Sequence, residues 1–204
     1  MMRRIDYDKG YIIVAPVDNT AEHSPLLTEE DHTHLATLTS PTRRAQWSTW
    51  RSIVRDELGA EASLRYNSMG APLLEREVGR VAYISVSHSA EWVAVMFGAT
   101  RCGVDIESHQ RNFSKVASRY ISAEEREALA EEIGPHFEAI AWGAKEAMYK
   151  YALTPGVDFT ADLLLVGHDN QGATLSATLY GLPLPDTHYL VLEDNQVLCY
   201  TFEF

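Results

Sequence analysis

Two acidic side chains that stand one residue apart in an apolar run are the first candidates for chemistry in this chain. The run reads Gly103-Val104-Asp105-Ile106-Glu107. If it is a strand, Asp105 and Glu107 share one face and lie roughly 6.6 Å apart along it. Two carboxylates at that spacing repel unless water, a basic partner or a metal ion lies between them, and oxygen ligands suit Mg²⁺. Taken alone, the pair is more typical of a solvated edge strand than of a metal site.

An acidic and a basic side chain, Glu146 and Lys150, are predicted on one helix that begins near Pro135. Its apolar spacing is helical, with Phe137, Ile140, Ala141, Ala144, Met148 and Tyr151 on one face. Trp142, Glu146 and Lys150 follow one another at intervals of four on the other face. A Glu-to-Lys pair at this spacing is usually a surface ion pair worth about 0.3–0.5 kcal/mol, so a catalytic role needs further support.

Hydroxyl and imidazole groups occur together in Ser87-His88-Ser89. We expect this segment to connect two strands, over residues 81–86 and 91–99, of which the second is buried on both faces. Such side chains can donate hydrogen bonds to phosphate oxygens, but serine and histidine are also ordinary turn residues.

Several arginines lie on a predicted helix that starts at Ser40 and Pro41 and ends at Gly59. The apolar stripe of this helix consists of Trp47, Trp50, Val54 and Leu58, and its arginines are Arg43, Arg44, Arg51 and Arg55. The arginines could bind an anion or form a solvated basic face, and the spacing does not decide between the two.

A further basic stripe follows the acidic strand. Arg111, Lys115 and Arg119 are spaced four residues apart, which predicts one face of a helix. A solvated face is the ordinary interpretation of such a run, although it is unusual in an acidic protein. Residues 122–125 then have the pattern of a capping box that opens another helix.

The arrangement of strands and helices predicts an α+β protein. An early strand is expected over residues 11–17, and a helix is expected to begin near Thr28. After Asp162 the chain again has strand character, over residues 163–166, 173–180, 189–192 and 197–202. Both halves of the chain therefore contain strands and a helix, although their sequences are not visibly repeated.

Composition restricts the classes of function. The chain has 204 residues and a net charge of −12, which argues against general binding to nucleic acid or anionic membranes. Two cysteines without metal-ligand spacing suggest neither a zinc site nor a disulfide framework, so a cytoplasmic setting is expected. No run approaches the ~20 apolar residues of a membrane span.

Three of these segments in this order resemble the 4′-phosphopantetheinyl transferases of the surfactin-synthetase-activating type. Members of that family have an S-H-S element, a G-[IV]-D-I-E strand and a W-x-x-K-E-x-x-x-K helix. The match covers about residues 80–151, with a fainter echo in the arginine-rich segment from Arg43 to Arg55.

The resemblance implies a fold of two similar α+β halves related by a pseudo-twofold axis, each a small antiparallel sheet with packed helices. The halves are expected at residues 1–102, with contacts to coenzyme A phosphates, and 103–204, with the magnesium site and the catalytic helix. Coenzyme A, the substrate, would bind between them.

The resemblance also implies roles for individual residues. Asp105, Glu107 and Glu146 would bind Mg²⁺, and Lys150 would face the pyrophosphate of coenzyme A and assist departure of the nucleotide. Glu146 is the expected base, and Glu125 is a second acid in a corresponding family position. The remaining contacts to coenzyme A phosphates would come from Ser87, His88 and Arg44 or Arg51.

The implied reaction moves 4′-phosphopantetheine from coenzyme A to a serine of an acyl or peptidyl carrier protein. The stripe Arg111, Lys115 and Arg119 would dock this acidic partner. No second subunit is needed to complete the site, so a monomer is expected. Whether the carrier belongs to fatty-acid, polyketide or nonribosomal-peptide synthesis is open.

Two positions differ from the family pattern. Ala71 stands where members commonly have a phosphate-binding lysine, and Gly143 stands where they have Ser or Thr. A mid-helix glycine costs about 1 kcal/mol relative to alanine, so Gly143 is expected to loosen the helix of Glu146. Ala71 supports an alternative function, that of a noncatalytic homologue that binds coenzyme A or a carrier protein. A structural protein with coincidental motifs is the remaining alternative.

Overall fold

The computed structural model describes residues 1–60 and 62–203, and the chain divides into two compact units, Met1–Arg101 and Cys102–Phe204. This boundary lies one residue before the predicted one. Antiparallel sheets and helices occur in both units, so the predicted α+β class is confirmed. The pseudo-twofold relation stays a prediction.

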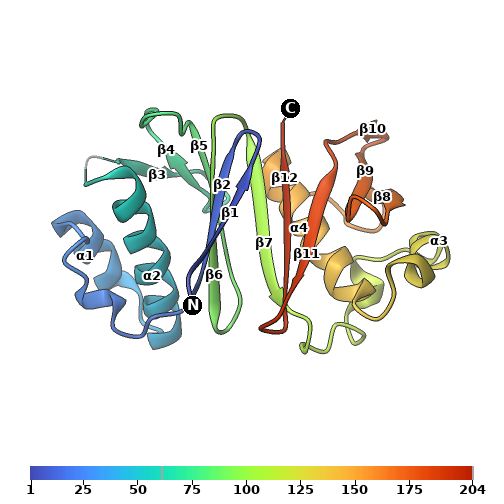
Figure 1. Ribbon diagram of the computed structural model, residues 1–204, viewed down its shortest axis with the longest axis horizontal. Helices are drawn as coiled ribbons and strands as arrows, with labels where there is room; N and C mark the ends of the chain where they lie inside the picture. The colour runs from blue at the N-terminus through green and yellow to red at the C-terminus, as the bar shows by residue number, and fades with distance from the viewer. Residues whose placement is uncertain (61, 204) are drawn as a thin grey trace. The chain divides into compact units, whose positions relative to one another are not determined.

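The sheet of the first unit is antiparallel and has the strand order β1-β2-β6-β5 (Figure 1). Its strands are β1 (Arg3–Tyr7), β2 (Gly10–Pro16), β5 (Tyr83–His88) and β6 (Trp92–Gly98). Every residue of β6 is buried, as its continuous apolar run predicted. Strand β1 was not predicted, because its sequence RRIDY is mostly polar and alternates between exposed and half-buried positions.

Helix α2 (Pro41–Leu58) packs its apolar stripe against this sheet. Its predicted ends are confirmed: the Ser40 side chain accepts a hydrogen bond from the backbone N–H of Arg43, and Gly59 ends the helix with a φ of 85°. Before α2 come a 3₁₀ turn, η1 (Ala21–His23), and helix α1 (Glu29–Thr37), which Thr28 caps. A hairpin of β3 (Leu64–Tyr66) and β4 (Pro72–Leu74) follows α2.

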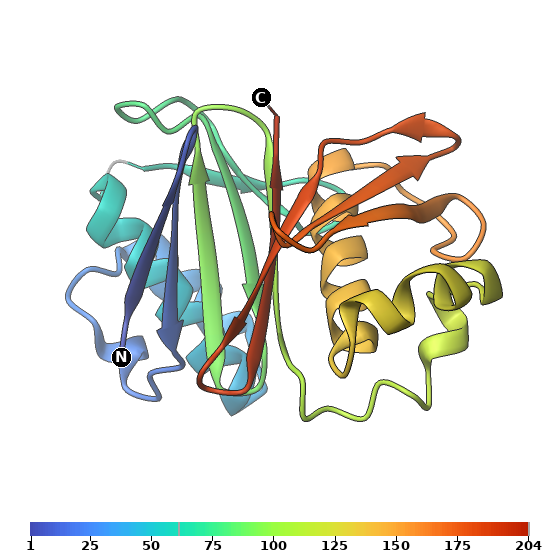
Figure 2. The same ribbon diagram turned by 45° about the vertical axis from the view of Figure 1, so that its right-hand side comes forward.

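The second unit has a larger antiparallel sheet with the strand order β10-β9-β11-β12-β7, and β8 also pairs with β9 (Figure 2). Its strands are β7 (Cys102–Ser108), β8 (Leu163–Asp169), β9 (Thr174–Leu179), β10 (Leu182–Pro183), β11 (Thr187–Leu192) and β12 (Gln196–Phe202). Strand β7 pairs with β12 along its whole length. The four predicted strands after residue 162 are therefore confirmed.

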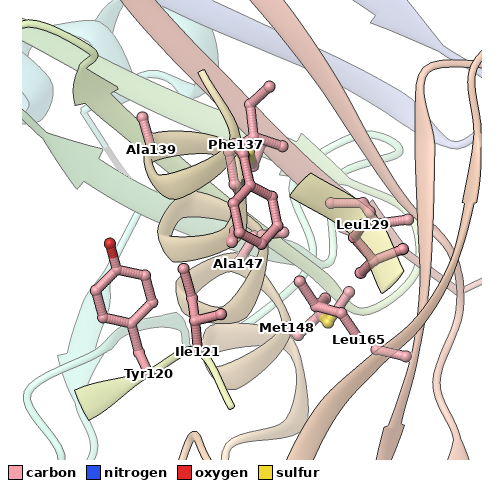
Figure 3. Close-up of a cluster of buried hydrophobic side chains, with 14 of the residues drawn as sticks. Tyr120, Ile121, Leu129, Phe137, Ala139, Ala147, Met148 and Leu165 are labelled. Carbon is pink, nitrogen blue, oxygen red and sulfur yellow. Dashed lines mark hydrogen bonds between the residues drawn. The ribbon is translucent and has the colours of Figure 1, made fainter. Parts of the chain in front are cut away.

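Helices α3 (Ala123–Ile133) and α4 (Phe137–Ala152) complete this unit. Figure 3 shows apolar side chains of α4, among them Phe137 and Met148, in one cluster with Tyr120, Leu129 of α3 and Leu165 of β8. This packing fixes α4 by its apolar face and leaves Trp142, Glu146 and Lys150 only half-buried.

The prediction of a helix that carries Arg111, Lys115 and Arg119 on one face is wrong. Between β7 and α3 the described chain contains only a 3₁₀ turn, η2 (Ala117–Arg119). Successive tight turns, closed for example by hydrogen bonds from Arg111 N to Ser108 O and from Val116 N to Phe113 O, replace the helix. They bury Phe113 and Tyr120 in the core, a demand that the spacing of the charged residues does not reveal.

In the described parts of the chain, no helix is both long enough and apolar enough to cross a membrane.

Candidate functional site

Two glycines allow helix α4 to approach strands β7 and β12 closely. A Cβ atom on Gly103, in β7, would overlap the backbone carbonyl oxygen of Ala147 in α4. A Cβ atom on Gly143, in α4, would lie 2.9 Å from the sulfur of Cys199 in β12 and 3.6 Å from Oδ2 of Asp105. Gly143 is therefore a close-packing position, and this explains a glycine in mid-helix despite its cost in helix propensity.

The close approach brings Lys150 of α4 to Asp105 of β7. The Lys150 ammonium donates hydrogen bonds to Oδ1 of Asp105, at 2.7 Å, and to the carbonyl oxygen of Val104, at 3.0 Å. The Asp105 side chain is only 5% exposed and that of Lys150 is 25% exposed. The strand therefore holds a buried carboxylate next to a partly buried cation.

Glu107, two residues further along β7, is held by two donors. The indole N–H of Trp142 lies 2.8 Å from its Oε1 atom, and the Arg111 guanidinium lies 3.0 Å from the same atom. Burial and the negative charge of Asp105 raise the pKa of Glu107, although Arg111 and Trp142 oppose the shift.

Glu146 is the third acid of the site. Among the residues that the structure describes, no hydrogen bond or ion pair involves its half-buried carboxyl group. Burial raises its pKa to about 7, and the charges of Asp105 and Glu107 add to this effect, while Lys150 and Arg111 act in the opposite direction. A carboxyl group with this pKa can accept or release a proton near neutral pH.

Oxygen donors of this kind suit a hard divalent cation. Asp105 raises the pKa of Glu107 and of Glu146, so positive charge between these groups would relieve their repulsion, and the donor chemistry fits Mg²⁺. Within residues 1–60 and 62–203, however, no three His, Cys, Asp or Glu side chains are arranged as a ready metal-binding group. Lys150 supplies the positive charge beside Asp105.

Glu125 lies in a different environment from the other acids. It is 4% exposed, and Oε1 is 2.5 Å from Nζ of Lys145, which is itself completely buried. The same carboxyl group accepts hydrogen bonds from the backbone N–H groups of Ser122 and Leu165. These contacts join the start of α3 to α4 and β8. A catalytic role for Glu125 stays a prediction.

In the first unit, Ser87 and His88 are the last residues of β5, so their predicted place on the connection is wrong. Ser87 is buried and His88 is half-buried. The side chain of His88 contacts the guanidinium of Arg43 in the first turn of α2. Arg43 was predicted only as one of the arginines of the helix, because the spacing of charges does not indicate a contact with His88, 45 residues away.

Arg44 and Arg51 differ in their surroundings. Arg44 donates two hydrogen bonds to Oε2 of Glu22, at 2.8 and 3.0 Å, and lines an open pocket of about 490 Å³. Arg51 is 4% exposed and binds Asp31 at 2.5 Å, and Arg55 binds the same carboxylate at 2.8 Å. Arg44 is accessible to a ligand, whereas Arg51 and Arg55 form a buried network with Asp31.

Ala71 lies in the hairpin turn between β3 and β4. Its backbone N–H donates to Oδ1 of Asn67 at 2.9 Å, and Gly70 beside it has a φ of 78°. The turn is thus stabilised by Asn67 and Gly70, and the methyl group of Ala71 brings no charge to it.

Comparison with known proteins is consistent with the chemistry of the second unit. Residues 101–200 match the family model of the 4′-phosphopantetheinyl transferase superfamily. The matched segment contains β7 and α4, and so includes Asp105, Glu107, Glu146 and Lys150. A search of curated proteins gives no significant match. Through this segment, the chain belongs to the 4′-phosphopantetheinyl transferase superfamily.

Proposed function

We propose that the protein transfers the 4′-phosphopantetheine group of coenzyme A to a serine of an acyl or peptidyl carrier protein, in a Mg²⁺-dependent reaction. Membership of the superfamily supports phosphopantetheine transfer in general. The observation that carries the proposal is the grouping of Glu146 and Lys150 of α4 with Asp105 and Glu107 of β7, which the hydrogen bond from Lys150 to Asp105 holds together.

Glu146 is the proposed general base. The serine oxygen of the carrier attacks the β-phosphorus of coenzyme A, a new O–P bond forms, and the P–O bond to 3′,5′-ADP breaks. The serine proton moves to the Glu146 carboxylate. Glu125 is the weaker candidate, because Lys145 and two backbone donors already occupy its carboxylate.

Asp105, Glu107 and Glu146 are the proposed ligands of Mg²⁺. When bound, the ion neutralises negative charge on the pyrophosphate, so that carboxylates can approach it. Lys150 would contribute a second positive charge, and its hydrogen bonds to Asp105 and to the carbonyl of Val104 hold its ammonium group in place.

Contacts to coenzyme A phosphates are proposed for residues of the first unit. Arg44 is supported by its position beside an open pocket. His88 is supported by its contact with Arg43, whose guanidinium places a positive charge beside the imidazole. Ser87 has a hydroxyl that can donate to a phosphate oxygen. Arg51 is the least supported of the four, since its guanidinium is bound to Asp31 in the interior.

Lys115 and Arg119 are the proposed docking residues for the acidic carrier. Both are exposed, although they do not share a helical face. Arg111 belonged to the same predicted stripe, but it binds Glu107 and so serves the carboxylate site as well. Complementary charge of this kind affects encounter with the partner more than chemistry.

One experiment tests the activity. The protein is incubated with coenzyme A, Mg²⁺ and several apo-carrier proteins, and the carriers are then weighed by mass spectrometry. The expected result is a phosphopantetheine mass gain on at least one carrier, which Glu146→Gln abolishes. Glu138→Gln is the matched control, because Glu138 lies on the same helix but pairs with Arg126. Full transfer by Glu146→Gln contradicts the assignment of the base.

The noncatalytic homologue is the second candidate, and the absence of a lysine at Ala71 favours it. It predicts binding of coenzyme A with no mass gain on any carrier. A cytoplasmic location and a monomeric state belong to the proposal as expectations, and gel filtration coupled to light scattering checks the second.

A further inference from the structure

Two hydrogen-bond donors from separate elements converge on one oxygen of Glu107. The indole N–H of Trp142, in α4, and the guanidinium of Arg111, in the loop after β7, both donate to Oε1 at 2.8 and 3.0 Å. Within the described residues, neither donor nor any other group makes a hydrogen bond to Oε2. The two oxygens of this carboxylate are therefore not equivalent.

Packing fixes the indole ring that supplies the first donor. Trp142 makes an edge contact with Tyr120, with ring centroids 5.0 Å apart, and a tilted contact with Phe159, at 6.0 Å. The backbone carbonyl of Phe159 accepts a hydrogen bond of 2.6 Å from the buried Lys145 ammonium. The position of the indole N–H is thus set by the core of the unit.

The second donor is more exposed and lies close to two aromatic rings. The Arg111 side chain is 50% exposed, and its guanidinium carbon lies 5.1 Å from the centroid of the Phe113 ring and 5.9 Å from that of the Trp142 ring. A guanidinium at this distance from an indole face is attracted to it. Arg111 therefore approaches Oε1 beside a surface that Phe113 and Trp142 provide.

We propose that Trp142 and Arg111 are positioning residues that hold Oε1 of Glu107 and so present Oε2 as the ligand atom for a divalent cation. This inference rests on the proposed function, because it concerns the cation of that reaction. Hydrogen bonds to one oxygen fix the rotation of the carboxylate and balance its charge, and loss of such supporting partners typically weakens metal binding 10- to 100-fold.

The first test needs no activity and observes the indole directly. The chain has four tryptophans, so an ¹⁵N spectrum contains few indole N–H signals, and the one that Trp142→Phe removes is assigned to Trp142. Glu107→Gln should shift this signal, because it replaces a charged acceptor with a neutral one. Glu127→Gln, on an exposed position of α3, is the control and should leave it unmoved. If the chemical shift of the Trp142 indole signal is the same in Glu107→Gln as in the wild type, the proposal is overturned.

The second test measures binding of Mn²⁺, a paramagnetic substitute for Mg²⁺, in the presence of coenzyme A by electron paramagnetic resonance. Trp142→Phe keeps an aromatic ring and loses the donor, and it should weaken Mn²⁺ binding about 10-fold. Arg111→Gln, at a position that is half exposed to solvent, should weaken it by a smaller factor. Trp47→Phe is the matched control, because Trp47 also donates an indole hydrogen bond, to Tyr66 at 3.1 Å, but lies in the first unit.

The outcomes separate this inference from the proposed function. Unchanged Mn²⁺ affinity in folded Trp142→Phe and Arg111→Gln overturns the positioning role and leaves the transferase proposal intact. Wild-type protein that binds Mn²⁺ through these residues but transfers nothing to any carrier supports the positioning role and overturns the transferase proposal. Wild-type protein that binds no Mn²⁺ overturns both the magnesium assignment and the positioning role.

Discussion

The ammonium of Lys150 lies 2.7 Å from a carboxylate oxygen of Asp105, 45 residues earlier in the chain. Helix α4 supplies the cation and strand β7 supplies the anion, so the ion pair depends on the close contact between these two elements. Glu146, one turn before Lys150 on the helix, has no such ion pair among the described residues. The site thus combines one neutralised carboxylate with one that titrates near neutral pH.

Glu146→Gln should stabilise the metal-free protein at high pH. Burial raises the folded pKa of Glu146 from 4.5 to about 7, so the folded state binds the proton more tightly than the unfolded state between these values. The wild type therefore loses stability as pH rises through this window, whereas the glutamine variant does not. Chemical unfolding with EDTA should show little difference at pH 4 and an advantage of the order of 2 kcal/mol for the variant above pH 8. Equal differences at both pH values contradict the shift.

Gly143→Ala should destabilise the protein although alanine is the better helix former. The added methyl group meets the sulfur of Cys199 at 2.9 Å, and crowding of this kind typically costs about 1–3 kcal/mol. Cys199→Ala removes the sulfur, so the double variant should recover most of the loss. Thermal and urea unfolding of the four proteins in this cycle give the coupling energy. Additive effects would show that the helix moves instead.

Lys145→Met should lower the free energy of unfolding by roughly 3 kcal/mol, because it leaves the buried Glu125 carboxylate without its cation. Adding Glu125→Gln removes the uncompensated charge, and we expect the double variant to be more stable than Lys145→Met alone. Denaturant unfolding measures both. A single variant as stable as the wild type would mean that the ion pair contributes little.

Charge reversal at Lys115 and Arg119 should raise the KM for the carrier several-fold and leave the KM for coenzyme A unchanged. The physical reason is loss of attraction between these exposed cations and an acidic partner, which low salt should accentuate. Arg76→Glu with Arg80→Glu, at exposed positions of the first unit, controls for net charge. Equal increases in both pairs assign the effect to overall charge rather than to a docking face.

Local patterns predicted the elements of the fold well. Ser40, Pro41 and Gly59 marked the two ends of α2, and the apolar spacing after Pro135 marked α4, because capping and amphipathicity act within a few residues. The stripe from Arg111 to Arg119 failed for the opposite reason. Exposed charges tolerate many backbone conformations, and burial of Phe113 and Tyr120 decided this one.

The composition of the candidate site was also predicted in part. Asp105 and Lys150 were expected to serve one site, and their hydrogen bond brings them together. The bond from Trp142 to Glu107 was not foreseeable, since nothing in the spacing of a tryptophan on a helix indicates an acceptor on a strand 35 residues earlier. Gly143 was expected to loosen the helix. Its role in close packing was not foreseeable, because the contact is with Cys199 of β12, a strand that lies far along the chain.

Strand β7 carries Asp105 and Glu107, and its hydrogen-bonded neighbour, β12, follows roughly ninety residues later. During synthesis on the ribosome, the acidic strand therefore emerges well before β12 exists, because α3, α4 and four further strands are made in between. The two carboxylates then keep an otherwise apolar nascent segment hydrated and hinder its association with other chains. The acids proposed for catalysis would also act as gatekeepers against aggregation while the protein is being made.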